Sequence, residues 1–375
     1  LSIGTFISLG FLGTSLLNNF LRETYIAKKS EIEKNIGKFL NKNVDLGDYR
    51  GIRMLGISLG NSKIIDKKDI NSEIKAKNIY VGLMPFRSLL NQKWIIKIEP
   101  EKTEININRD FFKIEKSYLS EKYISKSNFN YDLNFNLANY SNFKLSEIGL
   151  YTKVKGDLIY KSAEKQIIGN IKSYSKDRGN LKFKFHKKLN TDFLKFELYS
   201  NGLNLGLSEY NVANRKFLLK EGKFKSNFKF HKISNQTICK GGLSLNKIKL
   251  NTSGFEENIK SDSLKFICKK NNLIANNIAL NYGSLISDFN LNIPLNQKVN
   301  EIDLKGIIKF DASSTPDFNL SGGVEYWIDK KGINFGKLNS QFELRRTKLE
   351  YLNIFKERGI SGLVSANGNF GGSIN

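Results

Sequence analysis

Apolar residues occupy every second position in short runs along most of this chain, beginning near Val44. The clearest runs lie at 129–137, 181–185 and 203–207, where Phe, Tyr and Leu alternate with Asn, Asp, Lys and Gly. A period of two is typical of a β-strand with one buried face. Strands recurring about every 12 residues, without helices between them, predict an antiparallel meander of about 27 strands at ~4.8 Å spacing.

Before Val44 the pattern differs, and the chain divides into four expected segments. Residues 1–21 are expected to form a transmembrane anchor and 22–43 an amphipathic helix. Residues 44–118 and 119–375 are expected to form a first β region and its continuation. The predicted fold class is therefore mainly β: an N-terminal transmembrane helix, an amphipathic helix, and a long curled antiparallel β-sheet, or β-trough.

The anchor is predicted from the absence of charge between Leu1 and Leu21. As a helix this stretch would be about 32 Å long, against a hydrocarbon core of about 30 Å. A cleaved signal peptide and a buried core helix are the alternatives. The apolar part exceeds a usual signal-peptide core of roughly 7 to 15 residues, and no small-x-small cleavage site follows it.

The second segment carries a helical stripe at Ile32, Ile36, Phe39 and Leu40, with charges between these positions. We expect it to cap the β body, with packing on a membrane surface as the alternative. Within the β body, glycine-containing dipeptides predict turns. They are Asn201-Gly202, Gly241-Gly242, Lys331-Gly332 and the Gly179-Asn180 pair after Asp177-Arg178.

A sheet with one apolar face needs a cover for that face. It can pack on itself, or it can curl into a trough that holds ligands with acyl chains. The residues predicted to line a lipid groove are those of the three clearest runs, with Lys182 and Lys184 pointing outward. They are Phe129, Tyr131, Leu133, Phe135, Leu137, Leu181, Phe183, Phe185, Leu203, Leu205 and Leu207.

The formal net charge of +24 raises the possibility of nucleic-acid binding. Lysine far outnumbers arginine, however, and the lysines are scattered between apolar strand positions. Recognition of bases and phosphates favours the bidentate arginine fork. We therefore expect a solvated sheet face and no nucleic-acid partner, with an anionic membrane surface as the second interpretation of the charge.

The sequence predicts no catalytic residues, no metal site and no cofactor. His186 and His231 end alternating strands and lack a nucleophile or a ligand partner at a useful spacing, so both are expected at the surface. Glu256 and Glu257 lie in a polar stretch that keeps them solvated. Gly56 to Gly60 precedes a strand, not the helix of a phosphate loop. Cys239 and Cys268 are interpreted as free thiols, with a single bridge as the alternative.

Two stretches near the N-terminus resemble the TamB family in its cyanobacterial and plastid branch, within the AsmA-like group. The first is VDLGDYRGIRMLGISLGNSKI at Val44–Ile64, with glycine-spaced apolar residues. The second follows the AsmA-like order of a strand, a short helix containing Pro and a double Leu, two further strands separated by Pro100, and a closing Arg-Asp. Those elements are expected at 74–83, 85–90, 94–98 and 105–110. The chain departs from the family at Phe111-Phe112-Lys113, where a Gly and an aromatic residue are usual.

The resemblance implies a single-pass inner-membrane protein with its body in the periplasm. Its β-groove would conduct phospholipid toward the outer membrane, or support assembly or translocation of outer-membrane proteins. The expected partners are phospholipid, the inner membrane and an Omp85-type outer-membrane barrel reached through a C-terminal part beyond Asn375. A periplasmic scaffold that binds envelope proteins through its sheet edges is the alternative function, and an outer-membrane β-barrel is the alternative fold.

Overall fold

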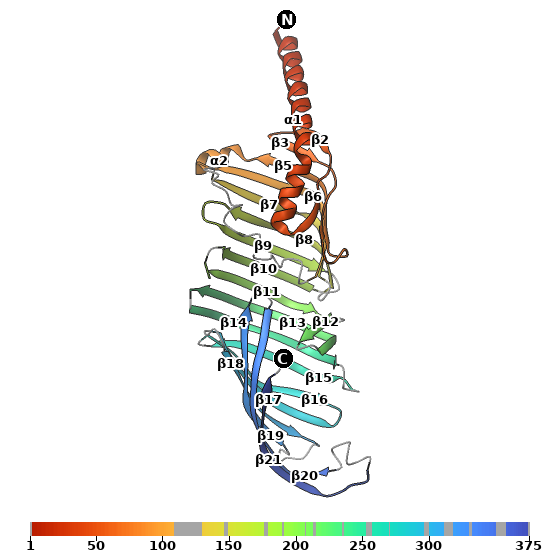
Figure 1. The fold of residues 1–375 in the computed structure, drawn as a ribbon, viewed down its shortest axis with the longest axis vertical. Helices are drawn as coiled ribbons and strands as arrows, with labels where there is room; N and C mark the ends of the chain where they lie inside the picture. The colour runs from red at the N-terminus through yellow and green to blue at the C-terminus, as the bar shows by residue number, and fades with distance from the viewer. Residues whose placement is uncertain are drawn as a thin grey trace. The chain divides into compact units, whose positions relative to one another are not determined.

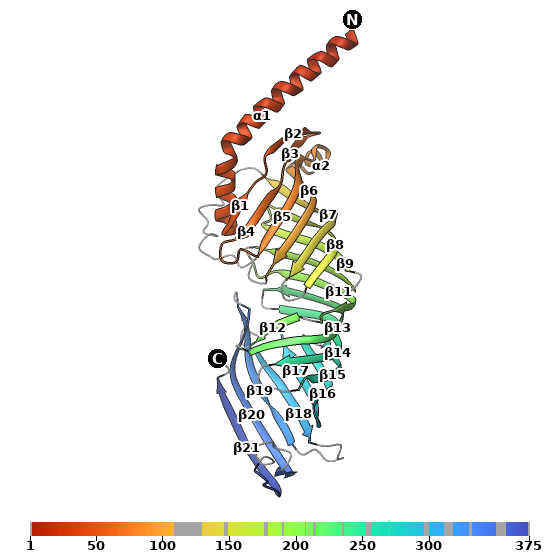
Figure 2. The same cartoon turned by 90° about the vertical axis from the view of Figure 1, so that its right-hand side faces the viewer.

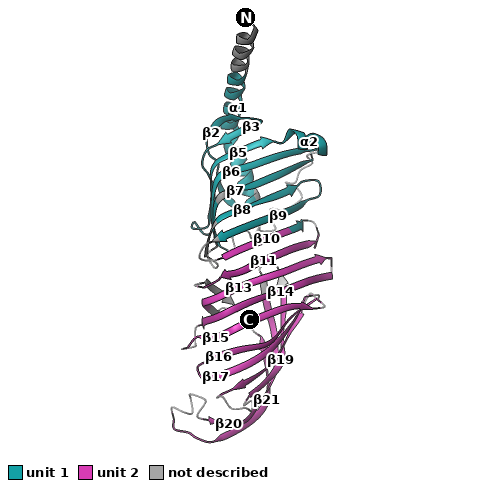
Figure 3. Cartoon of the chain, turned by 180° about the vertical axis from the view of Figure 1, so that it is seen from behind, with its two compact units in different colours: residues 1–175, 186–189 teal, residues 176–185, 190–375 magenta. Residues whose placement is uncertain are grey.

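The computed structural model shows a mainly β protein with two helices and 21 strands in its described residues (Figure 1). It describes residues 2–108, 130–145, 149–175, 179–189, 191–206, 208–212, 215–234, 236–252, 257–269, 271–295, 300–310, 318–329, 332–349 and 358–373. The strands belong to one large sheet. The described pairings are antiparallel except for one, between β6 and β7. The chain divides into two compact units, residues 1–175 with 186–189 and residues 176–185 with 190–375 (Figure 3).

Unit 1 begins with the long helix α1 (Ser2–Leu40) and contains the short helix α2 (Pro85–Asn91). Its strands are β1 (Lys42–Asp45), β2 (Tyr49–Arg53), β3 (Gly56–Leu59), β4 (Ser62–Asp66), β5 (Glu73–Leu83), β6 (Trp94–Ile107), β7 (Tyr131–Leu145), β8 (Gly149–Lys161) and β9 (Gln166–Ser175). β5 pairs with β3 and β4 on one side and with β6 on the other. The sheet then continues through β7, β8 and β9.

Unit 2 is a meander of longer strands. They are β10 (Gly179–Lys188), β11 (Leu194–Asn204), β12 (Ser208–Val212), β13 (Arg215–Ile233), β14 (Gln236–Thr252), β15 (Ile259–Lys269), β16 (Asn272–Tyr282), β17 (Leu285–Pro294), β18 (Asn300–Lys309), β19 (Phe318–Asp329), β20 (Gly332–Lys348) and β21 (Leu363–Ser373). The last residues of β10 group with unit 1. From β13 to β21 each strand pairs with the next, while β11 and β12 share one edge of β13.

The predicted mainly β class is confirmed, but the strands are longer and fewer than the 12-residue spacing predicts. Two of the predicted turns lie inside strands. Gly202 has φ +84 where the register of β11 shifts between Asn201 and Leu203, which is a β-bulge. Gly241, with φ +88, lies in the middle of β14, where a Cβ would collide with the carbonyl oxygen of Asn227. Glycine is needed at both places, but to bend a strand and not to end it.

Pro100 also lies inside a strand, although the resemblance predicted a break between 98 and 105. β6 is continuous because Pro100 sits opposite Ile79 of β5 while the pairing with β7 is interrupted between Ile98 and Glu104. A proline cannot donate a ladder hydrogen bond, so it is accepted where the pairing is interrupted. The predicted strand at 74–83 and helix at 85–90 are confirmed, whereas Arg109 and Asp110 lie outside the described residues.

α1 runs without a break through the two segments that the sequence separated at residue 21. Its C-terminal half lies against the first strands of unit 1, while its N-terminal half extends away from them (Figure 2). This half contacts β1 and β2, as expected for a cap on the β body, but the helix ends at Leu40, and Lys42 and Asn43 of the expected 22–43 segment belong to β1. In the part of the chain that the structure describes, neither helix has the combination of length and hydropathy required to span a bilayer.

Hydrogen bonds fix α1 on the sheet. The buried Tyr25 hydroxyl donates to the Gly47 carbonyl oxygen at 2.7 Å, and the Glu33 carboxylate accepts from the backbone of Leu46 at 2.8 Å. Burial, together with Glu33, Asp48 and Asp45, raises the pKa of Tyr25 to about 12. The phenol therefore remains a hydrogen-bond donor throughout the physiological pH range.

The ion pair between Lys42 and Asp66 joins β1 to β4. The two residues are register partners, both are buried, and the Lys42 Nζ lies 2.6 Å from an Asp66 carboxylate oxygen. Burial acts to raise the pKa of Asp66, but the Lys42 ammonium and the backbone N–H of Lys68 outweigh it and hold that pKa below its usual value. A carboxylate with a lowered folded-state pKa stabilises the fold above its unfolded pKa, and this contribution is lost as the pH falls through the folded value.

Lys42→Met should therefore lower the stability of unit 1 by about 3–5 kcal/mol at pH 7, because it leaves the Asp66 carboxylate buried without its cation. The measurement is hydrogen exchange of the β1 and β4 amides. Lys42→Met/Asp66→Leu, which removes both charges, should recover most of the loss. Equal exchange in the wild type and the single variant would show that the pair contributes little.

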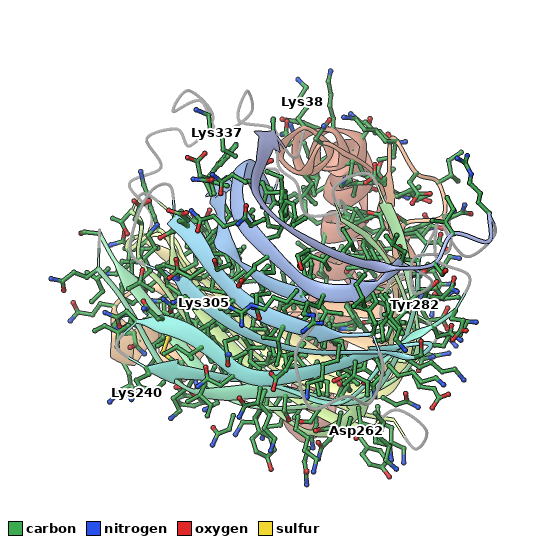
Figure 4. The ribbon with its side chains drawn as sticks, turned by 90° about the horizontal axis from the view of Figure 1, so that it is seen from below. Lys38, Lys240, Asp262, Tyr282, Lys305 and Lys337 are labelled. Carbon is green, nitrogen blue, oxygen red and sulfur yellow. A yellow bond between two sulfur atoms is a disulfide. The ribbon has the colours of Figure 1, made fainter. Side chains whose placement is uncertain are left out.

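Cys239 and Cys268 are joined by a disulfide between β14 and β15 (Figure 4), so the interpretation of both as free thiols was wrong. The sequence could not show this, because the cysteines are 29 positions apart and the segment between them contains most of two strands, whose pairing brings the cysteines together.

Reduction, or Cys239→Ser/Cys268→Ser, should destabilise unit 2 by about 3–4 kcal/mol, as expected for a bridge that closes a loop of this size. Thermal unfolding with and without reductant measures the effect. The double serine variant is the control and should be insensitive to reductant.

Candidate functional site

The two faces of unit 2 differ in chemistry and in exposure. Along β13, residues on one face are buried or half-buried: Phe224, Ser226, Phe228 and Phe230. Residues on the other face are exposed: Lys223, Lys225, Asn227 and Lys229. The pattern repeats on β20, where Leu338, Ser340, Phe342 and Leu344 alternate with Lys337, Asn339, Gln341 and Arg345, although Glu343 is half-buried. We call the side that carries Phe228 the apolar face.

Strand register aligns the apolar residues into rows that cross the strands. Phe196 of β11 is opposite Phe230 of β13, which is opposite Cys239 of β14. Further along, Ile278, Phe289, Gly306, Leu320 and Phe342 form one row from β16 to β20. Register partners point to the same side of a sheet, so these rows form one apolar surface across unit 2.

Aromatic rings contact one another at the beginning of this surface. The Phe183 ring lies 5.5 Å from that of Phe185 and 6.2 Å from that of Phe196. Phe196 in turn lies 5.0 Å from Phe230 and 5.9 Å from Phe228. A second group joins Phe318, Phe342 and Phe370 on β19, β20 and β21. These rings supply most of the apolar area at the two places.

Three serines on the apolar face of unit 2 are hydrogen-bonded to the backbone of the sheet. Ser200, Ser226 and Ser287 direct their hydroxyls into the sheet. They donate to the carbonyl oxygens of Asn180, Leu198 and Leu280 at 2.8, 2.8 and 2.9 Å. A hydroxyl that is satisfied by the backbone needs no water, so the surface above it can stay dry.

Burial indicates that the apolar face is the inner side of a curved sheet. Among the described elements of unit 2, the extensive backbone contacts join neighbouring strands. Yet Phe228 is only 5 % exposed and Ile278 4 %, whereas Ile238 and Ile267 on the opposite face are 47 % and 61 % exposed. Side chains converge on a concave surface and spread apart on a convex one. Figures 1 and 2 agree, since β20 and β21 stand across from β14–β16 instead of in their plane, and Figure 4 places Lys240 and Asp262 at the outer side of the ribbon.

Unit 1 has an apolar face of its own. The parallel pairing of β6 and β7 sets Ile98 beside Phe135, and β8 adds Leu158. The neighbouring row contains Ile96, Leu133 and Tyr160. The Tyr131 ring lies 6.2 Å from the Tyr160 ring at the end of this surface.

The structure places the predicted lining residues on these two faces. Unit 1 contains Tyr131, Leu133, Phe135 and Leu137, which are half-buried. Unit 2 contains Leu181, Phe183, Phe185, Leu203 and Leu205, of which Leu203 is buried beside Phe224. Lys184 is exposed as expected, whereas Lys182 is half-buried. Phe129 and Leu207 lie outside the described residues.

The prediction omitted the best-buried part of the apolar face. Ala275 and Ile278 are both on it, although they are three residues apart, because the register of β16 shifts at Asn277, which has φ +55. A bulge of this kind moves the period-two pattern by one residue, so a search for strict alternation misses the pair. The Asn276-Asn277 dipeptide, which favours such a conformation, was the available signal.

The two histidines have structural partners. His186 Nε2 lies 2.6 Å from the side-chain oxygen of Gln166. The ring centroids of His231 and Phe193 lie 5.3 Å apart in an edge-to-face arrangement. Both histidines are half-buried, whereas the sequence predicted both at the surface. The described residues contain no cluster of three or more His, Cys, Asp or Glu side chains placed to hold a metal ion.

Comparisons of the chain with protein-family models, with curated proteins and with solved structures give no match. The geometry of the apolar faces is therefore the basis for any functional argument.

If the apolar face is the inner one, Phe228→Asp should lower the stability of unit 2 by several kcal/mol, because it removes a buried ring and buries an unpaired carboxylate. Lys229→Asp, one residue away on the exposed face, should change the unfolding free energy by about 0.5 kcal/mol or less. Urea unfolding of both variants is the measurement. Similar losses for the two would contradict the assignment of the faces.

Proposed function

We propose that the apolar faces bind the acyl chains of phospholipid and that the protein carries lipid along its sheet. The observation behind this proposal is that each unit presents rows of apolar side chains on one face of a single layer of strands. In the part of unit 2 that the structure describes, the extensive backbone contacts are those between neighbouring strands. A soluble protein rarely leaves so large an apolar surface without an occupant.

Acyl chains match this surface in chemistry. Covering apolar area is favourable by roughly 25 cal/mol per Å², so even partial coverage by a lipid tail gives several kcal/mol. The rows run across many strands, so a flexible chain can lie along them with any headgroup left in water. The opposite face, with exposed lysines such as Lys225 and Lys229, stays solvated.

The cellular setting that we propose follows the TamB-like segments near the N-terminus. In it, the charge-free start of α1 attaches the protein to the inner membrane and the body lies in the periplasm. An Omp85-type barrel is the outer-membrane partner, and assembly or translocation of outer-membrane proteins is the related activity. The disulfide supports an oxidising compartment, since such bonds rarely persist in a reducing cytosol.

A scaffold that binds other envelope proteins through its edges is the second candidate. The observation in its favour is β21, which pairs with β20 alone among the described strands. An unpaired strand edge offers backbone N–H and C=O groups to a strand from another chain. This mechanism needs no ligand on the apolar face.

The test is photo-crosslinking to phospholipid in cells from positions 135, 183 and 184. We expect crosslinks at 135 and 183, on the apolar faces, and few at the exposed position 184. Phe135→Asp and Phe183→Asp should each reduce the lipid recovered with the purified protein severalfold, because each places a carboxylate in the path of the acyl chains.

Lys184→Asp is the matched control, since it adds the same carboxylate one residue away from Phe183 and should leave the bound lipid unchanged. Equal crosslinking at 183 and 184, or full lipid content in folded Phe→Asp variants, would reject lipid binding and favour the scaffold.

A further inference from the structure

One end of unit 1 exposes large apolar side chains that are separate from the apolar face. Phe86, Leu89 and Leu90 of α2 are 83 %, 80 % and 81 % exposed, and Met54 and Leu55 between β2 and β3 are also exposed. We call these five residues the apolar tip. Helix α2 has seven residues and none of them is buried, so packing contributes little to its stability. We therefore expect another surface to cover it.

Backbone hydrogen bonds hold the tip together. The Leu83 N–H donates to the Leu55 carbonyl oxygen at 3.0 Å, immediately before α2 begins. Ser88 of α2 accepts from the backbone of Ile95 through its hydroxyl at 2.9 Å. The helix and the β2–β3 turn are therefore fixed side by side at the same end of the sheet (Figures 1 and 2).

The β2–β3 turn is unusual in its residues. Arg53 is opposite Gly56, so Met54 and Leu55 form a two-residue hairpin turn, and Met54 has φ +52. Such turns favour Asn, Asp or Gly, because these residues adopt positive φ at low cost and tolerate water. Two exposed apolar side chains make this turn less favourable in water, which indicates that an apolar surface covers it.

The charge-free part of α1 begins at the level of this tip. The Asn18 side-chain oxygen accepts from the Tyr49 hydroxyl at 2.8 Å and from the Ile52 N–H at 3.2 Å, so β2 ends beside this turn of the helix. Leu16, Leu17 and Phe20 are exposed there. Figure 2 shows α1 leaving the sheet on the side that carries α2 and the β2–β3 turn.

Basic side chains predominate around the tip. The two segments that contain it, residues 50–57 and 84–94, and the neighbouring residues 2–22 of α1 contain Arg22, Arg50, Arg53, Arg87 and Lys93 and no Asp or Glu. Lys93 pairs with Asp132, and the Arg53 guanidinium lies 5.9 Å from the centre of the Tyr80 ring. An apolar surface surrounded by arginine matches a bilayer whose surface carries anionic headgroups.

We propose that the apolar tip docks into the interface of an anionic phospholipid bilayer, with Phe86, Leu89, Leu90, Met54 and Leu55 inserted among the acyl chains. Arg53 and Arg87 lie at the level of the headgroups. This docking holds the first strands of unit 1 against the membrane, and it requires no helix to span the bilayer. It is independent of lipid binding on the apolar faces, so either proposal can fail alone.

The experiment uses the full chain and a tryptophan reporter on α2. Phe86→Trp is introduced with Trp94→Phe and Trp327→Phe, which removes both natural tryptophans. Ile267→Trp in the same background is the matched control, because Ile267 is an exposed apolar residue on the polar face of unit 2. Both proteins are bound to vesicles of phosphatidylglycerol and phosphatidylcholine that contain brominated lipid.

We expect strong quenching at position 86 and little at position 267. Leu89→Gln/Leu90→Gln should reduce quenching at 86 at least threefold, whereas Ile238→Gln/Ile267→Gln in the position-86 reporter should leave it unchanged. Arg87→Glu should weaken quenching on anionic vesicles and have no effect on pure phosphatidylcholine. All five residues substituted in these variants are exposed, so folding is expected to be preserved.

Absence of quenching at 86 in vesicle-bound protein would overturn the proposal, as would quenching that is equal at 86 and 267. So would α2 variants that keep full quenching but lose a co-purifying protein, a result that would assign the tip to a protein partner. Lipid recovered with the purified protein reports separately on the apolar faces, and it should be unaffected by the α2 variants.

Discussion

The pleat of a single-layer sheet is the constraint on which the rest of this structure depends. Successive side chains point to opposite faces, so every strand that pairs in register adds its apolar residues to the same side. In unit 2 this continues from Phe196 on β11 to Phe342 on β20. Each strand is stabilised by its neighbours along the sheet, but the accumulated apolar face still has to be shielded from water.

Curvature reduces the free-energy cost of exposing the apolar face of unit 2 to water. Bending brings the rings of Phe183, Phe196 and Phe230 together and lets them shield one another. Bulges at Gly202 and Asn277 allow the strands to bend without exposing the apolar set. The disulfide between Cys239 and Cys268 links the neighbouring strands β14 and β15 covalently. The result is a surface that is partly buried by its own side chains and still open to a flexible apolar ligand, which is the physical basis for the proposed lipid binding.

The first strands of the sheet are stabilised in another way, by polar contacts with α1 and by an ion pair. Tyr25, Glu33 and Asn18 of α1 satisfy backbone groups of the first strands, and the ion pair of Lys42 and Asp66 locks β1 to β4. These polar contacts leave the apolar residues of α2 and of the β2–β3 turn facing outward. Unit 1 therefore has two distinct apolar surfaces, the apolar face along its strands and the apolar tip at its end. We propose acyl chains as the ligand of the first and an anionic bilayer as the partner of the second.

The sequence by itself determined the strand pattern and most of the faces. The alternation around Phe135 and Phe183 gave the residues that share one face of each strand, because the period of two is a local property of an extended backbone. Local signals also gave the helices expected at 22–43 and 85–90, although α1 ends at Leu40 and α2 at Asn91. Tertiary structure decided what depends on pairing between distant segments. It showed Gly241 inside a strand and not in a turn, Pro100 where a ladder is interrupted, and the two cysteines joined. It also showed which apolar residues remain uncovered, since Leu89 and Phe228 are equally apolar in sequence and only their neighbours in space distinguish an exposed tip from a buried face.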